Sequence, residues 1–375
     1  MVPTQRLPAS LTALDVALAA LLERIKPVAP VEVPLAEALG CVAAEMPPLQ
    51  AHPPRDTAVS DGWALHARDL VGASSYSPLP LSAPPVWVDA GDPMPEGCDC
   101  VIDADCVDPT GPLFQVLAEA SPGQGVRRIG GDIAEATTFS DFSAGRQIRP
   151  LDLVIARTVG LDRFNVRRPR LRIVGIPASS GEVVTVPLIA ENARAAGAEV
   201  VCVEAAGRDV VSVANALESD ACDMLVTVGG SGVGHNDATV TALASCGEIL
   251  AHGIALQPGR TAATGTIGNV PVVALPGAVD AALAAWWTLA LPLLDRLSGL
   301  WPRARLPLPL ARKIASSVGI AELVLLEQIE EAWLPLAVGD LSLSTIASAD
   351  AWLVVPGQSE GFAAGTPVDA YILRD

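Results

Sequence analysis

The sequence predicts a multidomain protein built around a doubly wound α/β domain, with β-rich segments before and after it. Its 375 residues exceed the roughly 100–200 residues of an ordinary domain, so about two to four domains are expected. Apolar strands alternate with helical patterns from Leu171 to Gly299, which indicates a parallel sheet covered by helices on both faces. Half of all residues are hydrophobic and 18% are charged, enough apolar material for several cores.

The elements of this α/β domain follow from short quoted runs. "LRIVGIP", "AEVVCVE", "DMLVTV" and "VPVVALP" are compact apolar strands. Each is followed by a helical pattern, over residues 183–197, 210–222, 237–247 and 279–297. In such a domain the ligand is expected at the carboxyl ends of the strands.

The flanking segments have other patterns. Leu11 to Ile25 predicts an amphipathic helix, with Thr12 to Asp15 spaced as a capping box. Proline, glycine and short alternating runs indicate an all-β module before the α/β domain, and short strands such as "AELVLLEQI" and "AWLVVP" indicate a further β domain after it. We expect a linking domain (1–46 and 141–168), a β module (47–140), the α/β domain (169–300) and a C-terminal β domain (301–375).

Charge and apolar runs restrict the function classes. The formal net charge of -18 disfavours nucleic acid and anionic membranes as partners. Asp15 and Glu23 interrupt the first apolar stretch, so no signal peptide is predicted, and the run Ala281 to Leu294 is shorter than the ~20 residues that span a bilayer. We expect a soluble, cytoplasmic protein that binds any anionic ligand through local positive groups.

Seven cysteines without a secretion signal suggest free thiols in a reducing compartment. In "CDCVIDADC", Cys98, Cys100 and Cys106 stand among three aspartates, as in a metal site. Strand alternation favours another interpretation, because the even positions 98–106 form one apolar face and the aspartates fall on the other. A core strand is therefore favoured over metal ligation.

The most informative stretch is "LVTVGGSGVGHNDATV", residues 225–240. A strand ends at Val228, and Asn236 or Asp237 can cap the helix that follows. Glycine permits positive φ and close approach of a ligand, while a helix N-terminus offers unpaired N–H groups. The loop is therefore either an anion cradle or a tight strand-to-helix turn, and its four glycines are Gly229, Gly230, Gly232 and Gly234.

Other candidates are weaker when taken singly. Pro276 and Gly277 follow the next strand at the same edge, and Arg260 on a proline-glycine turn is either an anion partner or an isolated surface arginine. In the β module, Asp61 in "VSDGWAL" and Asp132 in "GQGVRRIGGDI" are candidate acidic groups, although turn aspartates usually cap the backbone.

The order of these motifs resembles the molybdopterin molybdenumtransferase family, of the MoeA and gephyrin E-domain type. "VSDGWAL" resembles M-D-G-Y-A-V, "AGDPMPEGCDCVI" resembles T-G-A-P-V-P-E-G-C-E-A-V-V, and "GQGVRRIGGDI" is similar to N-I-R-R-x-G-E-D-I. "VTVGGSGVGHND" resembles I-T-S-G-G-V-S-V-G-x-x-D, "ALQPGRTAATG" resembles I-K-P-G-K-P-x-x-F-G, and "ALPGAVDAAL" resembles L-P-G-N-P-V-S-A. The matches are collinear from near Asp56 to Gly299, and the tail resembles the family's terminal β-barrel domain.

The resemblance implies a homodimer with a cleft between the β module of one subunit and the α/β domain of the other. There, adenylylated molybdopterin would receive molybdate with Mg²⁺ or another divalent cation, and AMP would be released. It gives Asp61, Asp132 and Asp237 catalytic roles, with Asp237 also a metal ligand. Phosphate binding falls to the four loop glycines and Arg260, and Pro276 and Gly277 would line the pocket. A molybdoenzyme or a molybdopterin adenylyltransferase is a further expected partner.

Several positions depart from the family pattern. The acidic pair of a T-G-D-E turn becomes Ala178 and Ser179, and the asparagine and second proline of L-P-G-N-P become Ala278 and Val279. The lysines become Gln257 and Arg260, and a further upstream lysine becomes Gly253. Each lost charge-assisted bond costs ~1.5–3 kcal/mol. Two functions therefore stay open: a working molybdotransferase, or a non-catalytic carrier or scaffold that binds molybdopterin or the finished cofactor.

Overall fold

The computed structural model describes residues 5–45, 48–138, 145–178 and 184–373. The chain divides into two compact units. The larger unit comprises Met1–Ala44, Ser143–Pro150 and Arg163–Asp375, and the smaller comprises Glu45–Phe142 and Leu151–Asp162. The four-part division expected from the sequence stays a prediction.

A six-stranded sheet forms the centre of the larger unit, in the order β14-β13-β15-β19-β18-β16. Four neighbouring strands are parallel: β14 (Glu199–Glu204), β13 (Arg170–Gly175), β15 (Met224–Val228) and β19 (Val270–Leu275). Next to β19, β18 (Ala263–Ile267) pairs antiparallel with it, and the edge strand β16 (Glu248–His252) pairs antiparallel with β18. The predicted doubly wound α/β domain is confirmed, with an antiparallel edge added.

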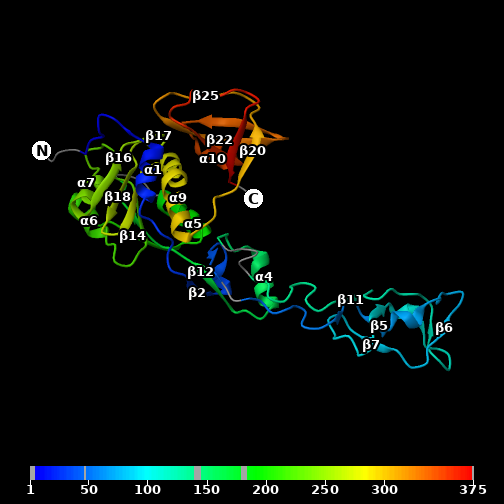
Figure 1. The fold of residues 1–375 in the computed structure, drawn as a ribbon. Helices are drawn as coiled ribbons and strands as arrows, with labels where there is room; N and C mark the ends of the chain where they lie inside the picture. The colour runs from blue at the N-terminus through cyan, green and yellow to red at the C-terminus, as the bar shows by residue number, and fades with distance from the viewer. Residues whose placement is uncertain (1–4, 46–47, 139–144, 179–183, 374–375) are drawn as a thin grey trace. The chain divides into compact units, whose positions relative to one another are not determined.

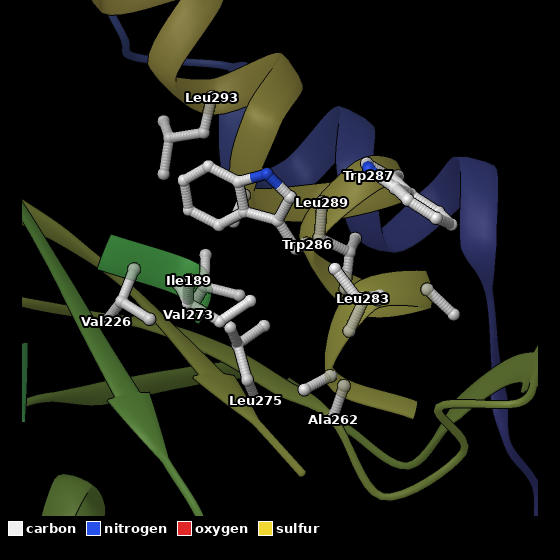
Figure 2. Close-up of a cluster of buried hydrophobic side chains, with 14 of the residues drawn as sticks. Ile189, Val226, Ala262, Val273, Leu275, Leu283, Trp286, Trp287, Leu289 and Leu293 are labelled. Atoms are coloured by element: carbon white, nitrogen blue, oxygen red, sulfur yellow. The ribbon is translucent and has the colours of Figure 1, made fainter. Parts of the chain in front are cut away.

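Helices cover both faces of this sheet because its strands alternate between two cores (Figure 1). Val226 and Val273 face α5 (Thr185–Ala195) and the long helical run formed by α8 (Val279–Ala285), a π-helical turn (Trp286–Ala290) and α9 (Leu291–Ser298). Leu225 faces α6 (Val210–Ala216) and α7 (Thr239–Cys246) on the other side. Figure 2 shows Trp286 and Ile189 from the helices beside Val226, Val273 and Leu275 from the strands.

The strand order creates a switch point. From β13 the chain adds β14 on one side, then crosses to add β15 on the other. The connections after β13 and β15 therefore leave toward opposite faces, and a crevice opens between their carboxyl ends. This is the position at which a doubly wound domain is expected to bind its ligand.

The N-terminal helix starts later than the sequence predicts. Thr12 and Ala13 form β1, which pairs with β17 (Ile254–Gln257), and α1 (Leu14–Leu22) begins only after them with no side-chain cap. The predicted capping box is wrong, because the backbone of Thr12 is used in strand pairing instead. A small sheet of β2 (Val31–Pro34), β12 (Arg163–Arg167) and β3 (Val42–Ala43) also belongs to this unit, with α2 (Leu35–Ala38).

The C-terminal strands extend a sheet that begins with β1 and β17. It continues through β22 (Ala321–Ile329), β24 (Ala351–Val355), β26 (Pro367–Ile372) and β20 (Arg305–Pro309), with β23 (Ala332–Val338) paired to β22. This part of the chain also contains a separate two-stranded sheet of β21 (Ile314–Ala315) and β25 (Gly361–Phe362), and the helix α10 (Leu343–Ser348). The predicted C-terminal β domain is present.

The smaller unit is built from short strands, as predicted. They are β4 (Thr57–Ala58), β5 (Gly62–Leu65), β6 (Leu79–Pro80), β7 (Val86–Val88), β8 (Cys100–Ile102), β9 (Val107–Asp108), β10 (Gln115–Val116) and β11 (Val126–Arg127). The helix α4 (Pro150–Thr158) follows them. Among the described residues, no helix is long and apolar enough to cross a membrane.

The cysteine-rich stretch is a strand only in part. Cys100 is buried in β8, but residues 104–106 form a 3-10 turn, so the predicted alternation over 98–106 is wrong beyond Ile102. Asp99 accepts the Ala67 N–H at 2.7 Å, and its carboxylate lies 3.5 Å from His66. No group of three metal-ligating side chains occurs among the described residues.

Candidate functional site

A cavity of about 540 Å³ opens at the carboxyl ends of β13, β15 and β19. Its position matches the switch point between β13 and β15. The lining includes most of the predicted site residues of the α/β domain: Gly229, Gly230, Gly232, Asp237, Pro276 and Gly277. These residues come from two different strand-to-helix connections, so the fold brings together two motifs that are distant in sequence.

The first two loop glycines are required by the backbone. Gly229 has φ +96° and Gly230 has φ +67°, and residues with a side chain rarely adopt such values. The Gly229 N–H donates to the Leu275 carbonyl at 2.9 Å, which ties the loop to the end of β19. A methyl group on Gly230 would collide with the Thr239 hydroxyl. These two glycines therefore shape the turn itself.

The other two glycines make room for Asp237. A Cβ added to Gly232 would lie 2.6 Å from Oδ2 of Asp237, and one added to Gly234 would lie 3.0 Å from the same atom. That oxygen accepts the Gly234 N–H at 3.0 Å. The bare loop thus folds around the carboxylate of its own aspartate. Gly234 supports Asp237 from outside the cavity lining.

The predicted cap and free N-terminus of α7 are corrected by the structure. Neither Asn236 nor Asp237 caps the helix, whose N-cap is Ala238 with no side-chain bond. Its first N–H groups are already paired: Thr239 donates to the Gly230 carbonyl, and Val240 and Thr241 donate to Oε1 of Gln5 at 3.0 and 3.4 Å. The start of α7 is therefore not an open anion site.

Free backbone donors lie instead within the glycine loop. Among the described residues, no acceptor pairs with the N–H groups of Gly230, Ser231 or Gly232. The Ser231 hydroxyl is buried and also lacks a partner in the described part of the chain. These donors border the cavity, as a cradle for anionic oxygens requires.

The cavity is lined by a cationic side chain, Arg208, that the sequence analysis missed. Arg208 follows β14, and its guanidinium crosses the end of β13 to donate to the Pro177 carbonyl at 2.8 Å and to Oδ1 of Asp237 at 3.0 Å. Asp237 thus uses both oxygens within the protein. The sequence signal was present, since Arg208 lies in the loop after a predicted strand whose carboxyl end meets the same edge as the glycine loop.

Arg260 lies elsewhere. It is exposed, its carbonyl accepts the Ile254 N–H, and it is not among the lining residues, although Thr261 beside it is. Its assignment as an anion partner stays a prediction. The other lysine-equivalent positions provide no cation, because Gln257 is exposed and uncharged and Gly253 packs against the N-terminal segment.

The positions that depart from the family pattern also border the cavity. Ala178, Ala278 and Val279 line it, so an alanine stands where the pattern has an acidic residue, another where it has asparagine, and a valine where it has proline. Ser179 lies outside the described residues. His252 lies beside the glycine loop, with its Nε2 3.4 Å from the Ser231 carbonyl. Burial lowers the pKa of this histidine.

The smaller unit holds the two other predicted aspartates around a separate hollow of about 520 Å³. Asp132 lines it and pairs with Arg127 at 3.2 Å. Asp61 accepts the N–H of Ala90, another lining residue, at 2.7 Å. Both residues are exposed, Asp132 lines the hollow and Asp61 bonds to a residue of its lining, and their catalytic roles stay predictions.

Three family models match consecutive parts of the chain. The MoeA N-terminal region (domain I and II) matches residues 12–160, a model described as a probable molybdopterin binding domain matches 165–296, and the MoeA C-terminal region (domain IV) matches 341–373. The second match contains the whole glycine-loop cavity as far as it is described.

Individual relatives agree with these matches. The chain is 29% identical to Molybdopterin molybdenumtransferase 2 of Mycobacterium tuberculosis, over 74% of this chain and 78% of the relative. It is 25% identical to Molybdopterin molybdenumtransferase of Synechococcus elongatus, over 84% and 87%. Among solved structures, the molybdopterin biosynthesis moeA protein from Pyrococcus horikoshii OT3 has a TM-score of 0.73 at 22% identity, over 97% of this chain and 100% of that one, which supports the fold.

Proposed function

Since the chain belongs to the MoeA family, we propose that it is a molybdopterin molybdenumtransferase. It would bind adenylylated molybdopterin, insert molybdate into the dithiolene and release AMP. The observation that carries this proposal is the cavity itself, in which unpaired loop N–H groups, a cation and a carboxylate meet at the switch point. A carrier without catalysis is not favoured, because the curated relatives are named as transferases.

Each part of the cavity has a chemical task in this proposal. The N–H groups of Gly230, Ser231 and Gly232 would donate to phosphate oxygens of the ligand. Pro276 and Gly277 would hold the ligand from the β19 side, with Gly277 fixed through the bond from the Thr185 hydroxyl to its carbonyl at 2.7 Å. A ligand held at several points loses less entropy at the reaction step.

Mg²⁺ or another divalent cation is proposed as the cofactor. Asp237 is the one carboxylate among the described lining residues. Mg²⁺ commonly binds through one or two carboxylates with water and substrate phosphates completing its shell, so this single acidic group fits when a phosphate ligand is present. The cation would neutralise phosphate and molybdate charge, which matters in a protein of net charge -18.

The remaining expectations form part of the same proposal. A homodimer is supported by the resemblance, and light scattering should give about twice the monomer mass of 38.5 kDa. A cytoplasmic location is supported by seven free thiols, which persist in reducing compartments. A molybdoenzyme or a molybdopterin adenylyltransferase stays the proposed macromolecular partner.

The direct test incubates the purified protein with adenylylated molybdopterin, molybdate and Mg²⁺ and measures AMP and active cofactor together. Both products above a protein-free blank are expected. Asp237→Asn should abolish insertion. The control Asp223→Asn should not, because Asp223 pairs with Arg170 at the amino ends of the strands, away from the cavity. Stoichiometric pterin binding without either product would instead establish a carrier.

A further inference from the structure

Arg208 is the one cationic side chain among the described residues that line the glycine-loop cavity. Its side chain is 27% exposed and its Nε is buried with no partner in the described part of the chain. The guanidinium is held at both Nη atoms, by the Pro177 carbonyl and by Asp237. It is therefore fixed in place at the cavity wall while its Nε–H donor is unused.

The charges of the cavity cancel when no ligand is bound. Arg208 and Asp237 form an ion pair at 3.0 Å, and the described lining holds no other charged side chain. The protein as a whole repels anions, with a formal charge of -18. An anionic ligand gains attraction from the arginine charge, in addition to the loop N–H groups, only if Arg208 is released from the aspartate.

We propose that Arg208 binds the phosphate of the pterin ligand, and that Asp237 holds it ready until a divalent cation takes over the carboxylate. This inference rests on the proposed function and names a residue for the same site. Guanidinium matches phosphate geometry with two parallel N–H donors, which a lysine cannot do. Arg208 thus supplies from β14 the charge that is missing at Gly253 and Gln257.

The exchange of partners explains why the two residues are paired. Cation binding at Asp237 removes the acceptor of one Nη, which is then free to donate to the phosphate, while the bond to the Pro177 carbonyl keeps the planar guanidinium in place. The cation takes Asp237 and leaves Arg208 without a partner, and the phosphate takes Arg208 and leaves Asp237 without one. Each ligand therefore favours binding of the other. Binding of the phosphate ligand is therefore expected to depend on the cation.

The first experiment measures the affinity of molybdopterin and of dephosphorylated molybdopterin for the wild type, Arg208→Ala and Arg208→Lys, in the presence of Mg²⁺. The wild type should bind the phosphorylated form about 10- to 100-fold more tightly, the range for a charge-assisted bond. In Arg208→Ala this ratio should fall to about threefold or less, and Arg208→Lys should lie between. The control Arg170→Ala removes a similar Arg–Asp pair at the opposite sheet edge and should keep the wild-type ratio.

A structural role would give another result. If Arg208 only braces the loop, Arg208→Ala weakens both forms of the ligand equally and the ratio is unchanged, which overturns the proposal. Titration with molybdate alone separates a second source of anion: a loss of molybdate affinity with an unchanged phosphate ratio also overturns it. A wild type that binds neither form of molybdopterin overturns the proposed function together with this inference.

The pairing of Arg208 with Asp237 predicts a variant that binds molybdopterin more tightly instead of more weakly. In Asp237→Asn, the amide oxygen can keep the Gly234 N–H while its NH₂ group faces Arg208, so the guanidinium is freed. Without divalent cation, this variant should bind molybdopterin about two- to fivefold more tightly than the wild type, the range for a partly exposed ion pair. Weaker binding than the wild type under these conditions would contradict the exchange of partners.

Discussion

Replacing Gln5 by alanine tests how the glycine loop is held. The Gln5 side chain is 8% exposed and bonds two segments more than 220 residues away in sequence. Its Nε2 donates to the Gly232 carbonyl at 2.6 Å, and its Oε1 accepts from the Val240 N–H at 3.0 Å. Two further bonds, both at 3.4 Å, are too long to add much.

The two short bonds determine how much the Gln5 side chain stabilises the start of α7. A net contribution of about 1 kcal/mol each gives about 2 kcal/mol, or roughly a 30-fold easier opening of the start of α7. Amide hydrogen exchange should therefore become about 30-fold faster at Val240 in Gln5→Ala. The neighbouring variant Arg6→Ala should not change it, because Arg6 is exposed. Unchanged exchange at Val240 in Gln5→Ala would refute the reasoning.

A glutamate at position 5 separates the bond to the glycine loop from the bond to the start of α7. Gln5→Glu keeps an acceptor for Val240, and a carboxylate at a helix start is favourable. It loses the donor to Gly232 and places an oxygen against that carbonyl. Protection at Val240 should persist while affinity for molybdopterin falls, whereas parallel losses of both would mean that the loop and the helix open as one unit.

Three other predictions concern single groups. In Gly232→Ala the new methyl displaces the Asp237 carboxylate, so molybdopterin affinity in a calorimetric titration should fall at least ~10-fold; an unchanged value would contradict the close packing. Burial lowers the pKa of His252 below 6.5, so the unfolded chain binds the proton first and stability should fall as pH drops below about 6.5. Urea midpoints at pH 7.5 and 5.5 should show this fall, and His252→Gln should flatten it. Burial raises the pKa of the Cys100 thiol to about 11, so native-state alkylation at pH 8 should modify exposed Cys246 and spare Cys100, and equal labelling would contradict this.

The strands and helices of the α/β domain could be predicted because their signals are local. Runs such as "DMLVTV" are mostly apolar, as strands buried on both faces are, and β15 forms there with all five residues buried. The switch-point rule then placed the candidate site at the carboxyl ends of the strands, where the cavity lies. Periodicity and topology thus predicted the fold and the end of the sheet at which the cavity lies, while the role of the cavity stays a proposal.

Long-range contacts explain what could not be predicted. The start of α7 is capped by Gln5, 235 residues earlier, so no local pattern could show that its N–H groups are occupied. The same holds for the helix start at Leu14, where pairing of Thr12 with Ile254 overrides a favourable capping sequence. Gly232 and Gly234 have a role that appears only when the Asp237 carboxylate is placed beside them.

The N-terminal segment takes part in several of these long-range contacts. It supplies Gln5 to the glycine loop, and Leu7 and Pro8 pack where a side chain on Gly253 would begin, with an added Cβ meeting them at 3.0–3.1 Å. Gly253 also has φ +77°, so a lysine there would be strained as well as crowded. A lysine at position 253 would therefore have to displace the segment that holds the loop. A cation from β14 does not, because Arg208 reaches the cavity over the end of β13, and the positive charge is accordingly found on that side.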